Sequence, residues 1–180
     1  MISPPDHPPP PNGCPPWYSK AISIVGPSHS GKTELICRLI PWLTARGLRV
    51  AVLKHSHHAI NEMGDRGKDT WRFRQAGARS VALAGPGFSQ ITRVFSGEPP
   101  LEKILQALQV EADVILVEGY KTGPLPKVAV LGQESGAKVP PYPRLRAVVS
   151  RESVATSLPC FRPDQIEELG RWLYEFLKQG

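Results

Sequence analysis

Short apolar runs alternate with amphipathic segments along the chain from Lys20 onward. Strand-like runs lie at residues 21–25, 50–53, 113–118, 127–131 and 145–149. Apolar residues at helical spacing predict helices at residues 32–45, 69–76, 101–108 and 164–178. Runs that are apolar throughout are typical of parallel strands joined by crossover helices. The pattern therefore predicts an α/β fold built on a mostly parallel sheet.

Local signals add detail to this pattern. Residues 80–84 and 90–95 are separated by Gly85-Pro86-Gly87, which predicts an antiparallel hairpin. Pro41 lies inside the first helical segment and predicts a kink or a short second segment. Asp164 is a suitable N-cap for the last helix.

The beginning of the chain has a different composition. Eight of the 20 prolines lie in the first sixteen residues, and proline neither donates a backbone hydrogen bond nor continues a helix. We predict that residues 1–19 form a disordered tail and that residues 20–180 form one folded domain. A chain of 180 residues that is 41% hydrophobic is large enough for one core.

The composition indicates the cellular compartment in which the protein works. No stretch approaches the ~18–20 apolar residues of a membrane helix, and the first residues lack the pattern of a signal peptide. Cys14, Cys37 and Cys160 fit neither a disulfide framework nor a zinc ribbon. We therefore expect a cytoplasmic protein without a membrane partner.

The formal net charge of +6 invites a nucleic-acid interpretation. The basic residues are scattered, however, and no basic stripe with interleaved aromatic residues is present. We expect no nucleic-acid partner. A domain that binds phosphorylated small molecules would carry the same excess.

The strongest chemical signal follows the first predicted strand. It matches the phosphate-binding pattern G-x-x-x-x-G-K-[ST] between a strand and a helix, through Gly26, Pro27, Ser28, His29, Ser30, Gly31, Lys32 and Thr33. The glycines allow backbone N–H groups to surround a phosphate, and the helix N-terminus adds partial positive charge. Lys32 would reach the β- and γ-phosphates, and the Thr33 hydroxyl would bind Mg²⁺.

Glu118 ends the most strand-like segment of the chain. In an open α/β sheet, a carboxylate at the end of a central strand lies beside the phosphate loop. Gly119, which follows, leaves room for a ligand. Glu118 would hold Mg²⁺ through water or orient a nucleophilic water, which makes it the one candidate catalytic residue.

Two further segments contribute candidate pocket residues. Lys54 and three histidines, His55, His57 and His58, follow the second strand. The histidines could bind a transition metal or line a pocket in their neutral form, and Lys54 could contact phosphate. A charged segment at residues 64–74 supplies Lys68 and Asp69. Asp69 would cap the helix, and Arg72 is better spaced than Arg74 to share a helix face with Lys68.

Together, these motifs resemble the MobB family of molybdopterin-guanine dinucleotide biosynthesis adapters. The markers are the phosphate loop, the histidine segment, Gly67-Lys68-Asp69-Thr70 with Ala76-Gly77-Ala78, and Glu118-Gly119-Tyr120-Lys121 followed by Pro126-Lys127. The resemblance implies a P-loop NTPase-like three-layer fold and a GTP-binding homodimer that uses Mg²⁺. It also implies an adapter, at most a weak GTPase, for the MobA guanylyltransferase, which attaches GMP to molybdopterin.

The chain departs from the family pattern in places. Asp65 lies one place closer to Gly67 than the family's acidic residue, which argues against a metal role. Tyr120 replaces a usual Phe, and Arg151-Glu152 stands where an Asp is frequent. No Asn-Lys-x-Asp motif occurs, so the preference for guanine rests on the resemblance alone.

Two alternatives remain open at this point. A small-molecule kinase on the same fold would need a second pocket with a clear base, and only Glu118 and Asp69 are candidates. A nickel-delivering metallochaperone GTPase is suggested by His55, His57 and His58.

Overall fold

A computed structural model describes residues 18–56, 64–132 and 138–178 of the chain. It divides into two compact units, one formed by Met1–His55 with Leu105–Gly180 and the other by Ser56–Ile104. Most of the predicted tail lies outside the described residues. Tyr18, which the prediction placed in the tail, contacts the first unit: its hydroxyl donates to the Pro124 carbonyl and accepts from Arg144.

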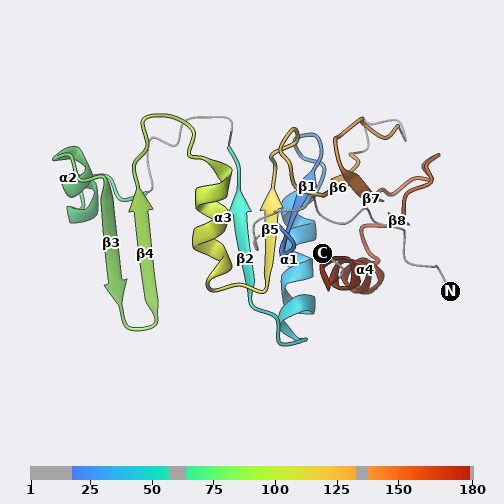
Figure 1. Ribbon diagram of the computed structural model, residues 1–180, viewed down its shortest axis with the longest axis horizontal. Helices are drawn as coiled ribbons and strands as arrows, with labels where there is room; N and C mark the ends of the chain where they lie inside the picture. The colour runs from blue at the N-terminus through green and yellow to red at the C-terminus, as the bar shows by residue number, and fades with distance from the viewer. Residues whose placement is uncertain (1–17, 57–63, 133–137, 179–180) are drawn as a thin grey trace. The chain divides into compact units, whose positions relative to one another are not determined.

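The first unit is built on a six-stranded sheet in the order β2-β5-β1-β6-β7-β8. Every pair of neighbouring strands in it runs parallel. The strands are β1 (Ala21–Val25), β2 (Val50–Lys54), β5 (Val114–Glu118), β6 (Lys127–Val130), β7 (Leu145–Val149) and β8 (Cys160–Phe161). The predicted α/β fold class is confirmed (Figure 1).

The central strands are the most apolar, as expected for strands covered on both faces. Residues Val114–Val117 of β5 are at most 3% exposed. The strand register aligns Glu118 with Ile24 of β1 on one side and with Lys54 of β2 on the other. The end of β2, the end of β5 and the loop after β1 therefore meet at one edge of the sheet.

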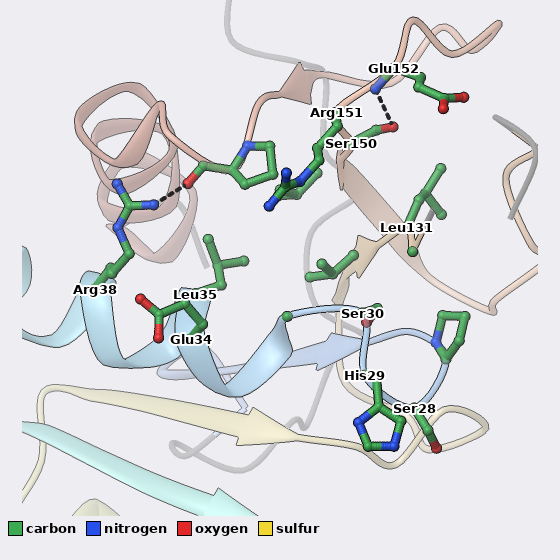
Figure 2. Close-up of a pocket in the computed structure, with 16 residues that line it drawn as sticks. Ser28, His29, Ser30, Glu34, Leu35, Arg38, Leu131, Ser150, Arg151 and Glu152 are labelled. Carbon is green, nitrogen blue, oxygen red and sulfur yellow. Dashed lines mark hydrogen bonds between the residues drawn. The ribbon is translucent and has the colours of Figure 1, made fainter. Parts of the chain in front are cut away.

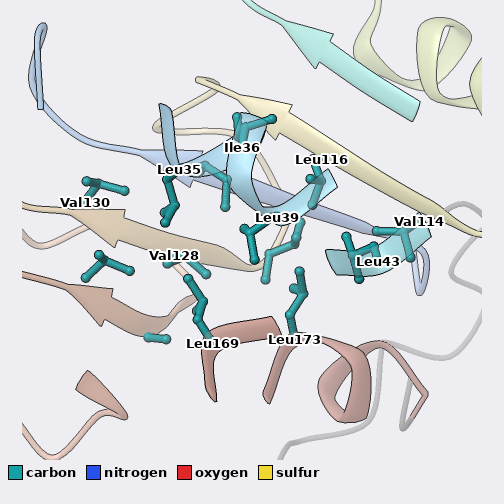
Figure 3. Close-up of a cluster of buried hydrophobic side chains, with 14 residues drawn as sticks. Leu35, Ile36, Leu39, Leu43, Val114, Leu116, Val128, Val130, Leu169 and Leu173 are labelled. Atoms are coloured by element: carbon teal, nitrogen blue, oxygen red, sulfur yellow. The ribbon is translucent and has the colours of Figure 1, made fainter. Parts of the chain in front are cut away.

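Two helices cover the same face of this sheet, α1 (Lys32–Thr44) and α4 (Ile166–Lys178). Their apolar stripes pack with alternate strand residues into one core (Figure 3). Leu39, Leu43, Leu169 and Leu173 of this core are at most 1% exposed. The helix α1 continues through Pro41, so the predicted second segment does not form.

The contact between α1 and α4 depends on Gly170. A Cβ at this position would lie 2.6 Å from two carbons of the Trp42 ring. The ring is also packed against Arg46, whose guanidinium lies 3.4 Å from its centroid. Trp42 therefore has little room to move away.

We expect Gly170→Ala to lower the free energy of unfolding by about 1–2 kcal/mol, because overpacking outweighs the helix propensity that alanine gains. Chemical denaturation measures this change in the free energy of unfolding. In a Trp42→Leu background the clash is absent, and the same substitution should be neutral or stabilising. A loss of equal size in both backgrounds would contradict the packing explanation.

The opposite face of the sheet buries a lysine. Lys127 is 0% exposed, and its ammonium donates to the carbonyls of Gly123 and Leu125 at 2.6 and 2.8 Å. Desolvation, with repulsion from Arg144 as a smaller cause, lowers the pKa of Lys127 to about 8. Sequence analysis treated Lys127 only as part of a strand and a motif.

This burial predicts a pH dependence of stability. An unfolded lysine titrates near 10.4, so between about pH 8 and 10.5 the unfolded chain holds more protons at this site and stability rises with pH. We expect Lys127 to contribute a rise of about 2 kcal/mol over that window. Urea denaturation of the wild type and of Lys127→Met at several pH values isolates this contribution. Free energies of unfolding that change with pH in the same way in both proteins would contradict the prediction.

The second unit contains the predicted hairpin, made of β3 (Ser80–Gly85) and β4 (Phe88–Arg93), which pair antiparallel. The helix α2 (Asp69–Gln75) precedes the hairpin, and α3 (Leu101–Gln109) begins in this unit. The loop before α2 is held by Asp65, which accepts two hydrogen bonds from Arg74 and one from Thr70, each at 2.7 Å.

Two sequence predictions are corrected at the C-terminal end. The helix α4 begins at Ile166, so Asp164 is not its N-cap. Instead the Gln165 side chain accepts a hydrogen bond from the Arg162 N–H, and the Asp164 carbonyl accepts one from the Ile166 N–H. The short strand β8 was not predicted. No helix within the described ranges is long and apolar enough to cross a membrane.

Candidate functional site

The loop after β1 is held tightly against the sheet. A Cβ on Gly26 would lie 2.2 Å from the Val130 carbonyl oxygen, so only glycine allows this approach. Gly31 ends the loop in the left-handed region at φ 91°, where glycine is favoured. His29 also has a positive φ, of 58°. These constraints fix the path of the phosphate loop, residues 26–33.

The N-terminus of α1 opens onto this loop. No side chain caps the helix, so its first N–H groups remain available to an anion. The Lys32 ammonium donates to the carbonyl of Pro27. This contact places the lysine across its own loop, where it would meet a bound phosphate.

Glu118 connects the phosphate loop to β2. Its Oε2 accepts a hydrogen bond from the Thr33 hydroxyl at 2.8 Å, and its Oε1 lies 3.3 Å from the Lys54 ammonium. The Glu118 side chain is 13% exposed. The structure thus brings together Thr33 and Glu118, the two residues predicted to bind Mg²⁺.

The donor set fits that metal. Mg²⁺ prefers oxygen ligands and is typically held by one or two protein groups with waters and substrate phosphates. A hydroxyl and a carboxylate in contact at the mouth of a phosphate loop provide such groups. Within the described part of the chain, the buried Ser30 hydroxyl has no hydrogen-bond partner, which gives the loop one more donor for an anionic ligand.

Three lysines gather near Glu118. Desolvation lowers the pKa of Lys32. Glu118 raises this pKa by attraction, whereas Lys121 and Lys54 lower it further by repulsion. One carboxylate does not balance three ammonium groups. The site therefore carries excess positive charge, as a polyphosphate site requires.

His55 packs against the segment that follows Glu118. Its ring lies 4.2 Å from that of Tyr120, and its backbone N–H donates to the Glu118 carbonyl. A Cβ on Gly119 would come within 3.0 Å of the His55 Cβ, so glycine permits this packing. His57 and His58 lie outside the described residues, and no group of three metal-ligating residues occurs within the described ranges.

A cavity of about 550 Å³ adjoins the phosphate loop. The loop and α1 form one wall and the segment after β7 forms another (Figure 2). Arg38 of α1 donates to the Pro163 carbonyl at 2.8 Å and closes one end. Arg151 points into the hollow, whereas the Glu152 carboxylate points away from it (Figure 2).

The charged segment of the second unit has a structural role in part. Asp65 pairs with Arg74 rather than serving as a metal ligand, and this pairing holds the pKa of Asp65 well below its usual range. The Arg72 N–H donates to the Lys68 carbonyl one helical turn earlier, as the predicted spacing requires, and the Arg72 guanidinium lies 3.7 Å from the Asp69 carboxylate. The prediction that Asp69 caps α2 is wrong, because the N-cap is Lys68 and no side chain caps this helix. Lys68 and Asp69 belong to a different unit from the phosphate loop, so their pocket role stays a prediction.

Sequence reasoning missed the ion pair between Lys54 and Glu118 and the contribution of Arg38 and Ser150 to the cavity. Lys54 was a pocket candidate, but its partner follows only from the strand order, which places β2 beside β5. The ends of β2 and β5 could each be predicted from the sequence, but not that these two strands lie side by side.

Known proteins are similar to this chain in sequence and in fold. The family model described as MobB, molybdopterin guanine dinucleotide synthesis protein B, matches residues 21–151. A molybdopterin-guanine dinucleotide biosynthesis adapter protein of Haemophilus influenzae is 35% identical over 161 residues, covering 86% of this chain and 90% of that protein. The probable adapter protein of Bacillus subtilis is 30% identical over 149 residues, covering 79% and 85%.

The fold agrees with a solved member of the same family. The crystal structure of Bacillus subtilis MobB matches with a TM-score of 0.73 at 27% identity, covering 89% of this chain and 99% of that one. The match therefore includes nearly the whole of that protein. From sequence and fold together, this chain belongs to the MobB family.

Proposed function

We propose that this protein is a GTP-binding adapter in molybdopterin guanine dinucleotide biosynthesis and that it assists a MobA-like guanylyltransferase. Membership of the MobB family supports the pathway, since its relatives carry the adapter name. The observation that carries nucleotide binding is the Thr33–Glu118 contact at the mouth of an uncapped phosphate loop. The reducing cytoplasm predicted from cysteine usage suits this work.

The residues have distinct roles in this proposal. Backbone N–H groups of the loop and the start of α1 receive the phosphates, and Lys32 neutralises their charge. Thr33 and Glu118 would hold Mg²⁺, which would neutralise part of the phosphate charge. Among the described residues we assign no arginine or glutamine to a hydrolytic water, so we expect any hydrolysis to be slow.

The cavity next to the loop would receive the nucleoside. Its volume of about 550 Å³ lies within the range of small-molecule sites. Arg151 and Ser150 line it, and the Arg151 guanidinium offers a planar surface for a base. The preference for guanine over adenine rests on the family resemblance.

A homodimer is part of the proposal, and the hairpin supports it. A two-stranded hairpin alone is marginally stable in water. Large apolar side chains are nonetheless exposed on both of its faces, with Leu83 at 53% and Phe88 at 64% on one and Ile91 at 63% on the other. A second copy of the chain would cover these faces.

The two alternative functions gain no support from the described residues. Of the three histidines behind the nickel-delivery alternative only His55 is described, and its ring packs against that of Tyr120. The kinase alternative still lacks a base other than Glu118 and Asp69. We therefore retain the adapter function.

Reconstitution tests the proposal. Purified protein, GTP, Mg²⁺ and a molybdenum cofactor guanylyltransferase are mixed, and formation of the guanine dinucleotide is followed with and without the adapter. We expect faster formation, preference for GTP over ATP in a competition assay, and loss of stimulation in Lys32→Ala. Equal stimulation by the wild type and by Lys32→Ala would contradict the proposal.

A further inference from the structure

Lys54 holds an unusual position in the phosphate site. It is the last residue of β2, it lies beside Glu118 in the strand register, and its ammonium is 3.3 Å from Oε1. The two side chains differ in exposure, with Lys54 at 64% and Glu118 at 13%. The carboxylate is thus withdrawn from water, whereas the ammonium on its long stem has room to move.

The two oxygens of Glu118 have different partners. Oε2 accepts from Thr33, and Oε1 faces Lys54. A divalent cation held by Thr33 and Glu118 would carry two positive charges to the group that Lys54 now neutralises. The metal and the ammonium then compete for one carboxylate, and their mutual repulsion favours departure of the mobile ammonium.

The phosphates of a bound nucleotide would give that ammonium a new partner within the same site. A nucleoside triphosphate brings about four negative charges, of which Mg²⁺ neutralises two. Lys32 is directed across the phosphate loop, so a second lysine at its mouth complements the remaining charge.

We propose that Lys54 is an exchangeable cation of the nucleotide site. It neutralises Glu118 while the metal is absent and transfers to the phosphates of the bound nucleotide once Mg²⁺ occupies the carboxylate. This rests on the proposed nucleotide binding and adds a residue that couples metal entry to phosphate capture. Lys54 is therefore a binding residue in the loaded state and a competitor of the metal in the empty state.

The test is Lys54→Met, which keeps the stem and removes the charge. Two affinities are measured: that of Mn²⁺ alone, by electron paramagnetic resonance, and that of Mg²⁺ with GTP, by calorimetry. We expect Mn²⁺ to bind about tenfold more tightly, because its competitor is gone, and Mg²⁺–GTP to bind about tenfold more weakly, because a phosphate contact is lost.

Opposite changes are the signature of exchange. A lysine with a merely structural role would lower both affinities, and a spectator would leave both unchanged; either outcome overturns the proposal. Lys54→Arg should restore both affinities to near the wild type. Lys178→Met, an equal charge loss at the end of α4, should change neither.

The same experiment separates this inference from the proposed function. If the wild type binds Mg²⁺–GTP and Lys54→Met binds it equally well, only the role of Lys54 fails. If the wild type shows no binding of Mg²⁺–GTP, the nucleotide-binding function fails and the exchange fails with it. Equal melting temperatures of the variants would establish that the fold is intact in each comparison.

Discussion

Lys32→Ala is expected to weaken the binding of a nucleoside triphosphate by about 2–4 kcal/mol, roughly 30- to 1,000-fold. The reason is the loss of a partly desolvated cation at the centre of the phosphate loop, where its ammonium already reaches across to Pro27. Isothermal titration calorimetry with GTP and Mg²⁺ measures the change.

The fold should survive this substitution, because Lys32 is absent from the core that α1 forms with the sheet. The melting temperature should therefore stay within about 2 °C of the wild type. Lys178→Ala provides a control of equal charge. Unchanged GTP affinity in Lys32→Ala would remove the phosphate-loop assignment.

The second large effect concerns the hairpin. Phe88→Glu combined with Ile91→Glu is expected to weaken self-association by about 4 kcal/mol, roughly a thousandfold, since each substitution removes a large apolar side chain and adds a charge. The two residues lie on opposite faces of the hairpin, so the pair tests whichever face is covered. Sedimentation velocity across a concentration series measures the dimer.

Ser89→Glu combined with Gln90→Glu is the matched control, because these exposed polar residues sit on the same two faces. It adds the same charge without removing apolar area and should weaken the dimer much less. A wild type that remains monomeric at about 100 µM would exclude the homodimer, and equal effects of both pairs would exclude the apolar contact.

The sheet and the phosphate loop could be predicted because their signals are local. The unbroken apolar run of β5 requires burial on both faces, and the glycines and Lys32 of the loop follow directly from what a phosphate needs. The contact of Thr33 with Glu118 followed from topology, since both residues are at strand or loop ends on the same edge.

The hydrogen-bond partners of side chains in irregular loops could not be predicted. Lys127 is buried with its ammonium donating to the carbonyls of Gly123 and Leu125, and the sequence does not show how the loop before β6 directs these carbonyls. Asp65 pairs with Arg74, nine residues along the chain, and no local pattern selects this arginine over Arg72. The start of α4 was predicted two residues too early. The side chain that accepts the Arg162 N–H in the turn before the helix is that of Gln165, not of Asp164.

Glu118→Gln, compared with the wild type in a titration of GTP with and without Mg²⁺, tests the central claim most directly. The claim is that Thr33 and Glu118 hold Mg²⁺ at a phosphate loop. The substitution keeps the shape of the side chain and removes its charge. We predict that GTP affinity in EDTA changes little, whereas the gain in affinity on adding Mg²⁺ falls by about tenfold or more. Superimposable Mg²⁺ titrations of the two proteins would contradict the account and remove Glu118 from the site.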